Sequence, residues 1–253
     1  MSDRLASASN SNPSSTARVI WALVTYVWLA LAAYAALLVA PTEKTMGLIY
    51  RIFYFHVPSF WTAFIAIAVT TFGSIAYLKS RAAKWDWIAV ASAELATAFL
   101  TIGLITGPIW AKPVWGIWWT WDARLTSTFV LWLLYISYLI LRGLLEDPEK
   151  KATLSAVFGI FASLDMPLVY VSNRLWRTQH PQPVILGGES SGLQATMAYT
   201  LVFCMIAICG VMILVLRDRY QLELMRNELA ELRFAADRRE AAGSVGNLGT
   251  ARG

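Results

Sequence analysis

QATMAYTLVFCMIAICGVMILVL, residues 194–216, runs for 23 positions without a charged side chain. At a rise of about 1.5 Å per residue, a helix of this length crosses a hydrocarbon core of about 30 Å. Similar apolar runs fall at about 19–40, 56–78, 86–108, 126–145 and 152–172. The sequence therefore predicts an all-α integral membrane protein with six transmembrane helices.

The composition supports a membrane protein and argues against a soluble enzyme core. Hydrophobic residues make up 57% of the 253 positions and charged residues 15%, whereas soluble domains average about 45–50% and about 25%. The net charge of +5 does not indicate nucleic-acid binding, because membrane proteins carry excess Lys and Arg as orientation signals. Cys204 and Cys209 are five positions apart, which fits neither a CxxC nor a CxxCH motif, so we expect buried, inert thiols.

The short connectors predict the orientation of the spans. KSRAAKWD at 79–86 and RGLLEDPEKK at 142–151 concentrate Lys and Arg on one side, and the side with such short basic connectors is cytoplasmic. An even number of spans places both termini on that side. The outer loops then fall at about 41–55, 109–125 and 173–193, and these loops are the richest in aromatic residues and proline.

Four regions are expected along the chain. Residues 1–17 are polar and read as a disordered cytoplasmic segment, and residues 18–216 form the six-span domain, with its Trp-rich outer loop at 109–125. Residues 217–240 form a cytoplasmic amphipathic helix, and residues 241–253 a disordered tail. The apolar stripe of the amphipathic helix consists of Leu222, Met225, Leu229 and Leu232. This stripe fits a partner protein and the anionic membrane surface equally well.

Two acidic residues fall inside the predicted spans. Glu94 lies in the third span and Asp165 in the fifth, and such residues are functional candidates because a charge in hydrocarbon is unfavourable. For Glu94 the alternative is a hydrogen-bonded contact between helices. Asp165 precedes Pro167 at an expected helix break, where it could brace the loop that carries His180.

The chain contains only two histidines, and both fall at the outer membrane boundary. His56 opens the second span and His180 precedes the sixth. Two imidazoles at one membrane level could fill both axial positions of a haem iron. The alternative is that each is an interface residue hydrogen-bonded to the backbone.

The loop between the third and fourth spans is unusually rich in tryptophan. Its candidate binding residues are Trp115, Gly116, Trp118, Trp119, Trp121, Asp122 and Arg124. One or two indoles would be headgroup anchors, but four form a flat apolar surface suited to a planar macrocycle. The guanidinium of Arg124 could bind a carboxylate such as a propionate.

WGIWWTWDARLT at 115–126 resembles the WWD signature of the haem-handling proteins of cytochrome c biogenesis. Together with HVPSFW at 56–61, WRTQH at 176–180 and six spans, it is similar to the CcmC family among them. The resemblance implies axial ligation by His56 and His180, a Trp platform from Trp115 to Asp122, and propionate contacts from Arg51 and Arg124.

The resemblance also implies a function and partners. A member of this family holds haem b transiently at the periplasmic face of a bacterial inner membrane and presents it to a periplasmic haem chaperone. It works beside ABC-type transporter subunits and a small single-span subunit, and it is not an enzyme. Two alternatives stay open. One is a haem-attachment synthase acting on apocytochrome c, which would normally be a larger chain, and the other is a secondary transporter unrelated to haem, which would need a polar pathway through the spans.

Overall fold

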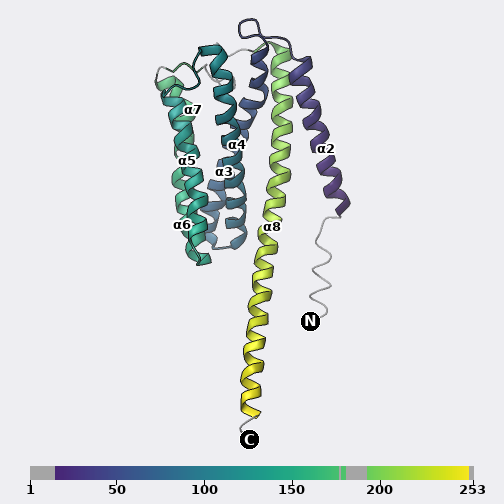
Figure 1. Ribbon diagram of the computed structural model, residues 1–253, viewed down its shortest axis with the longest axis vertical. Helices are drawn as coiled ribbons and strands as arrows, with labels where there is room; N and C mark the ends of the chain where they lie inside the picture. The colour runs from purple at the N-terminus through teal and green to yellow at the C-terminus, as the bar shows by residue number, and fades with distance from the viewer. Residues whose placement is uncertain (1–14, 177, 181–192, 251–253) are drawn as a thin grey trace.

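The computed structural model describes residues 15–176, 178–180 and 193–250, and this part of the chain consists of helices and connecting loops (Figure 1). In chain order the elements are α2 (Ser15–Tyr34), the π-helical turn η1 (Ala35–Val39), the 3-10 helix η2 (Leu48–Ile52), α3 (Phe53–Ser80), α4 (Ala83–Trp115), α5 (Ala123–Leu144), α6 (Pro148–Ser163), α7 (Asp165–Leu175) and α8 (Ala195–Thr250).

The predicted all-α membrane architecture is confirmed. Among the described residues, six segments are long and apolar enough to cross a membrane: Thr16–Val39, Leu48–Ser80, Ala83–Trp115, Ala123–Leu144, Pro148–Leu175 and Ala195–Arg238. The last one belongs to a single helix that continues without a break into the charged region, so the sixth span and the predicted amphipathic helix are one element. This helix ends at Thr250, inside the segment for which the sequence predicted disorder.

The fifth span is broken where the sequence indicated a helix break. α6 ends at Ser163 and α7 begins at Asp165. Pro167 lacks an N–H group and therefore cannot donate a hydrogen bond to the preceding turn. The N–H of Leu164 instead bonds the carbonyl oxygen of Phe161 at 3.1 Å, in a tighter turn. α7 starts a new helix that packs on α5.

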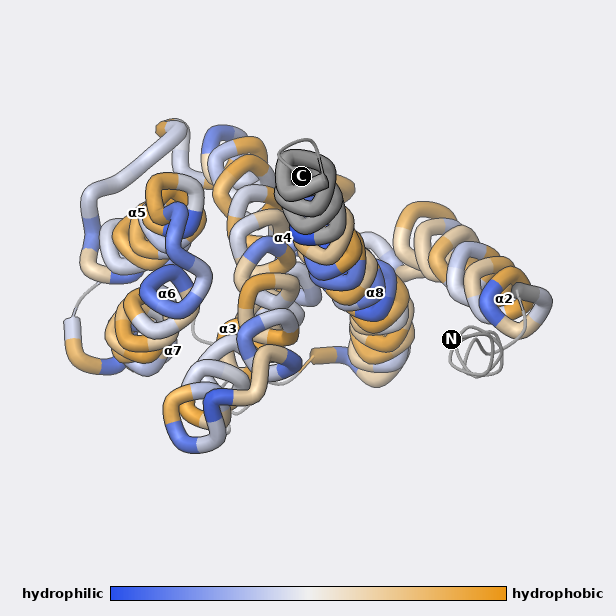
Figure 2. Tube along the Cα trace, turned by 90° about the horizontal axis from the view of Figure 1, so that it is seen from below, coloured by the Kyte–Doolittle hydropathy of each residue, from blue (hydrophilic) through white to orange (hydrophobic). Residues whose placement is uncertain are grey.

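The closely packed pair α3 and α4 lies at the centre of the bundle. Viewed from one end, α5, α6 and α7 cover one side of this pair, while α8 and then α2 lie on the other (Figure 2). Small residues allow the close approach of α3 and α4, as is usual for helices in membranes. A Cβ atom at Gly73 would lie 2.9 Å from the carbonyl oxygen of Trp85, so only glycine fits there.

Ion pairs join the helices at the end of the bundle where α2 begins. Arg18 of α2 binds Asp218 of α8 at 2.9 Å. Arg219 forms a two-pronged pair with Glu94 of α4, with Nη2 2.5 Å from Oε1. Glu94 therefore makes an interhelical contact, and this contact accounts for an acidic residue within a span.

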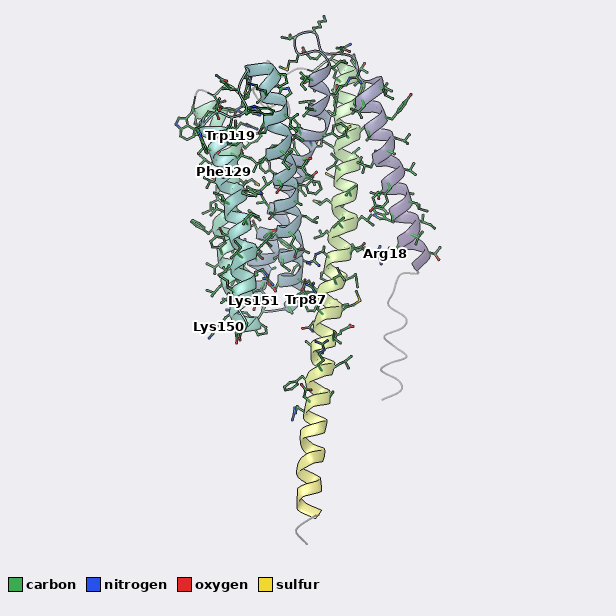
Figure 3. The ribbon with its side chains drawn as sticks, in the orientation of Figure 1. Arg18, Trp87, Trp119, Phe129, Lys150 and Lys151 are labelled. Carbon is green, nitrogen blue, oxygen red and sulfur yellow. The ribbon has the colours of Figure 1, made fainter. Side chains whose placement is uncertain are left out.

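The basic connectors and the Trp-rich loop lie at opposite ends of the bundle. Figure 3 shows Trp119 at one end, with Lys150 and Lys151 at the other. This separation is what the topology prediction requires. We call the end that carries Trp119 the outer end, and its orientation toward the periplasm stays a prediction.

Candidate functional site

A cavity of about 810 Å³ opens at the outer end of the bundle. We call it the outer cavity. It is lined by side chains of the segment 42–52, of α3, α4, α5, α7 and α8, and of the chain on either side of residues 181–192. Most of these side chains are apolar or aromatic. Its volume falls within the range of roughly 300–1,000 Å³ that is typical of sites for small molecules and cofactors. Five of the predicted site residues line it: His56, Trp115, Trp119, Arg124 and His180.

His56 lies in the first turn of α3 and reaches across to α4. Its Nδ1 is 2.8 Å from Oγ1 of Thr106. Its ring also makes an edge-to-face contact with Phe60, with centroids 5.0 Å apart. The imidazole is thus held between two helices by one polar and one aromatic contact, which limits its rotation.

His180 approaches the same cavity from the chain beyond α7. Its ring makes an edge contact with Trp115, with centroids 6.4 Å apart, and Trp115 in turn packs edge-on against Trp110 at 4.9 Å. The two histidines, 124 positions apart in the sequence, therefore line one cavity. Iron ligation by them stays a prediction.

The four tryptophans of the predicted platform do not all line the outer cavity. Trp115 and Trp119 line the outer cavity, whereas Trp118 and Trp121 are 58% and 73% exposed and stand outside its lining. Trp121 packs its ring against Trp119 with centroids 5.7 Å apart. A bound macrocycle would accordingly contact two indoles directly, and the other two face outward, where an interfacial anchor would lie.

Asp122 positions the start of α5. Its Oδ1 accepts hydrogen bonds from the backbone N–H groups of Arg124 and Leu125, both at 3.0 Å, and its Oδ2 accepts one from the hydroxyl of Thr120 at 2.8 Å. This is an N-cap, which satisfies amide groups that the helix leaves unpaired. Asp122 lies outside the cavity lining, so it shapes the loop and places Arg124 in the first turn.

Two polar atoms at the outer cavity have no partner among the described residues. Nη1 of Arg124 and Nε1 of Trp119 are buried and make no hydrogen bond in this part of the chain. Buried donors are almost always satisfied in folded proteins. A guanidinium and an indole N–H that line one cavity together suit a carboxylate ligand.

Gly116 and Arg51 have structural positions outside the cavity lining. Gly116 ends α4 with a φ of 78°, a left-handed conformation that favours glycine. α4 reaches Trp115, so the Trp-rich loop is shorter than the predicted 109–125. Arg51 donates to the carbonyl oxygens of Ala36 and Ala40 at 3.4 and 3.3 Å. It therefore closes the end of η1. Its Nε is buried and makes no hydrogen bond among the described residues, so the expected contact of Arg51 with a propionate stays a prediction.

Three lining residues and one neighbour of the cavity were not singled out in the sequence. Phe60, Trp61 and Tyr170 line the cavity, and Trp61 contacts Tyr170 with ring centroids 6.1 Å apart. Thr106 lies outside the lining and contacts His56. The spacing of His56 and Phe60 by four positions was a usable signal, because such residues share one helix face. The contact of Thr106 with His56 spans 50 positions and left no such signal.

Asp165 does not line the outer cavity. Its Oδ2 is buried and makes no hydrogen bond among the described residues. The expected brace would act on the loop that carries His180, of which residues 177 and 181–192 lie outside the described residues, so this role of Asp165 stays a prediction.

The donor set at the outer cavity suits a metal that brings its own macrocycle. Within the described residues, no group of three or more His, Cys, Asp or Glu side chains is placed to hold a bare metal ion. A haem iron already has four pyrrole nitrogens and needs only axial ligands, for which two imidazoles suffice.

Comparisons with known proteins agree with this chemistry. A family model described as "Heme exporter protein C" matches residues 1–235. The chain is 32% identical over 233 residues to heme exporter protein C of Bradyrhizobium diazoefficiens, covering 88% of both chains. It is 30% identical over 214 residues to the protein of that name from Haemophilus influenzae, covering 83% of this chain and 85% of the other. The corresponding protein of Escherichia coli is 32% identical over 164 residues, covering 60% and 66%.

Proposed function

Because the chain belongs to the heme exporter protein C family, we propose that it binds haem in the outer cavity through His56 and His180 and presents it for cytochrome c maturation. The family is one of haem transport components, so the protein is a delivery component and not an enzyme. The haem is its cargo. The observation that carries the proposal is that the only two histidines of the chain line one cavity.

Different residues around the outer cavity would contact different parts of the haem. His56 and His180 would occupy the two axial positions of the iron, which leaves no open position for oxygen chemistry. Arg124 and Trp119 would bind a propionate, since both present a buried and unpartnered N–H donor. Trp115 lies against the ring of His180 and would contact the macrocycle beside it.

The chemistry of covalent attachment belongs to the haem and to the receiving protein. Bound iron porphyrin supplies vinyl groups that a nucleophile of the receiver can attack. This chain contributes orientation, through rigid indoles and two ligands on different elements. We propose a periplasmic haem chaperone as the receiver of haem b from this cavity.

The setting is a membrane complex. As a multi-pass inner-membrane protein of this family, the chain works with an ABC-type transporter. We propose that a small single-span subunit joins them, that both termini are cytoplasmic and that the outer cavity is periplasmic. The Lys and Arg residues of the connectors support this orientation, because Lys150 and Lys151 lie at the end opposite Trp119 (Figure 3).

The test is an optical spectrum of the full-length protein purified in detergent with bound haem. We expect low-spin, bis-histidine bands for the wild type, a weakened spectrum for His56→Ala or His180→Ala, and loss of these bands for the double variant. Met197→Leu is the matched control, because Met197 also lines the cavity and a thioether is the other common axial ligand. An unchanged low-spin spectrum in the double histidine variant contradicts the proposal.

A further inference from the structure

The side chain of His56 meets α4 at one polar atom. Its Nδ1 lies 2.8 Å from Oγ1 of Thr106. The same oxygen lies 2.8 Å from the carbonyl oxygen of Ile102, one turn earlier in α4. A carbonyl oxygen can only accept a hydrogen bond, so the single hydroxyl proton of Thr106 is donated to Ile102.

This arrangement decides which nitrogen of His56 carries the proton. Because the hydroxyl proton of Thr106 is already used, its oxygen acts as the acceptor toward the imidazole. Nδ1 of His56 must then be the donor. A neutral imidazole carries one ring proton, so the lone pair is on Nε2. That lone pair is the one available to bind iron.

The surrounding residues of α4 make room for this geometry. A Cβ atom at Gly107 would lie 3.4 Å from Cε1 of His56, and a Cβ atom at Gly103 would lie 2.5 Å from the ring of Phe60. Phe60 in turn contacts the imidazole edge-on. Gly103 thus lets the ring of Phe60 pack directly on the backbone of α4, whereas a Cβ atom at Gly107 would only make ordinary van der Waals contact with His56.

We propose that Thr106 is a positioning residue that holds His56 in the Nδ1–H tautomer and so presents Nε2 to the haem iron. The inference rests on the proposed function, because it takes His56 to be an axial ligand. Histidines that bind metals usually donate their second N–H group to a fixed acceptor, which orients the ring and increases its basicity. Here a threonine hydroxyl is that acceptor, and the helix carbonyl behind it fixes the direction of the bond.

The test compares Thr106→Val, which removes the hydroxyl, with Thr106→Ser, which keeps it. Both are made in the full-length protein, and haem affinity and the Fe(III)/Fe(II) midpoint potential are measured. We expect Thr106→Val to weaken haem binding by about 10–100-fold and to raise the potential, because a less basic imidazole stabilises Fe(III) less. Thr106→Ser should stay close to the wild type in both measurements. Thr71→Val is the matched control, since the hydroxyl of Thr71 donates to Ile67 in the same way and lies away from the cavity lining.

The results for the Thr106 and His56 variants distinguish a failure of this inference from a failure of the proposed function. If Thr106→Val keeps the wild-type affinity and potential while His56→Ala loses haem, the inference is wrong and the proposed function stands. Equal losses in Thr106→Val and Thr106→Ser also contradict it, because the hydroxyl would not be responsible. If His56→Ala binds haem with an unchanged spectrum, the proposed function fails first. Thr106→Ala, measured in the same way, replaces the valine variant if that variant aggregates.

Discussion

Replacing Arg124 with Met should weaken haem binding without weakening the fold. Nη1 of Arg124 is buried at the outer cavity and has no partner among the described residues. A hydrogen bond to a charged group contributes about 1.5–3 kcal/mol, which corresponds to roughly a 10–150-fold change in Kd. In the variant Nε1 of Trp119 can still donate to the propionate, as proposed above, so haem binding should be reduced and not abolished.

The stability of the cargo-free protein should not fall in this variant. The backbone N–H of Arg124 bonds Asp122, and a change of side chain leaves that bond in place. Removing the side chain also removes a buried Nη1 donor that has no hydrogen bond among the described residues. We therefore expect the melting temperature of the cargo-free variant to equal or exceed that of the wild type.

The assay titrates the detergent-purified protein with iron protoporphyrin IX and, separately, with its dimethyl ester. The ester has the same ring and iron but lacks both carboxylates. Arg124→Met should reduce affinity for the acid form and leave affinity for the ester unchanged. Arg124→Lys keeps the charge without the planar guanidinium, so its affinity for the acid form should lie between those of the wild type and Arg124→Met. Lys79→Met removes a cation from an exposed position at the far end of α3 and should bind both ligands normally. Equal weakening for the acid and the ester would refute a carboxylate contact by Arg124.

Three further outcomes follow from the geometry of the outer end. Trp119→Ala should reduce haem content and transfer to a receiving chaperone, while the haem that remains keeps a bis-histidine spectrum. Trp121→Ala should have a smaller effect, because that indole is 73% exposed. Equal losses of haem content per protein in the two variants would contradict this ranking. Asp122→Ala removes the N-cap of α5 and should lower the stability by about 1 kcal/mol and also lower haem loading. Asp122→Asn should keep most of the stability and most of the haem loading. Thermal unfolding with and without haem checks this, and wild-type stability and loading in the alanine variant would show that the cap is dispensable. A cysteine placed at Lys44 should react with a membrane-impermeant thiol reagent from the periplasm, and one at Lys150 should not; the reverse labelling would overturn the orientation.

Much of this fold could be predicted from the sequence, because its main constraint is local. A span must be long and apolar, and both properties can be read from a single stretch such as residues 194–216. The break before Asp165 was equally visible, since Pro167 removes a backbone donor. The partner of Glu94 was not visible. Arg219 lies 125 positions away, and its contact depends on how α8 packs against α4.

The positions of the candidate site residues could be predicted in part. His56 begins a span and His180 falls in the connector before the last span, so both could be assigned to the outer membrane level, and both line one cavity. Trp118 and Trp121 belong to a short non-helical loop, where side-chain direction has no period that a sequence can reveal. The role of Arg51 was assigned through a resemblance, and nothing in the local sequence signalled its bonds to the carbonyl oxygens of Ala36 and Ala40.

The two ends of the bundle differ in a way that limits what this chain can do with its cargo. The outer end holds the cavity, while the described residues at the other end are joined by ion pairs between helices. Arg142 binds Asp86 at 2.6 Å, with both side chains only 12–13% exposed, and Arg219 binds Glu94. A secondary transporter places its site near the bilayer midplane and opens it to each side in turn. Such an opening would have to separate these partly buried partners, and unpaired charges in a low-dielectric setting are unfavourable, which opposes it. These ion pairs therefore favour haem exchange at the outer end over an alternating opening of this chain to the two sides of the membrane.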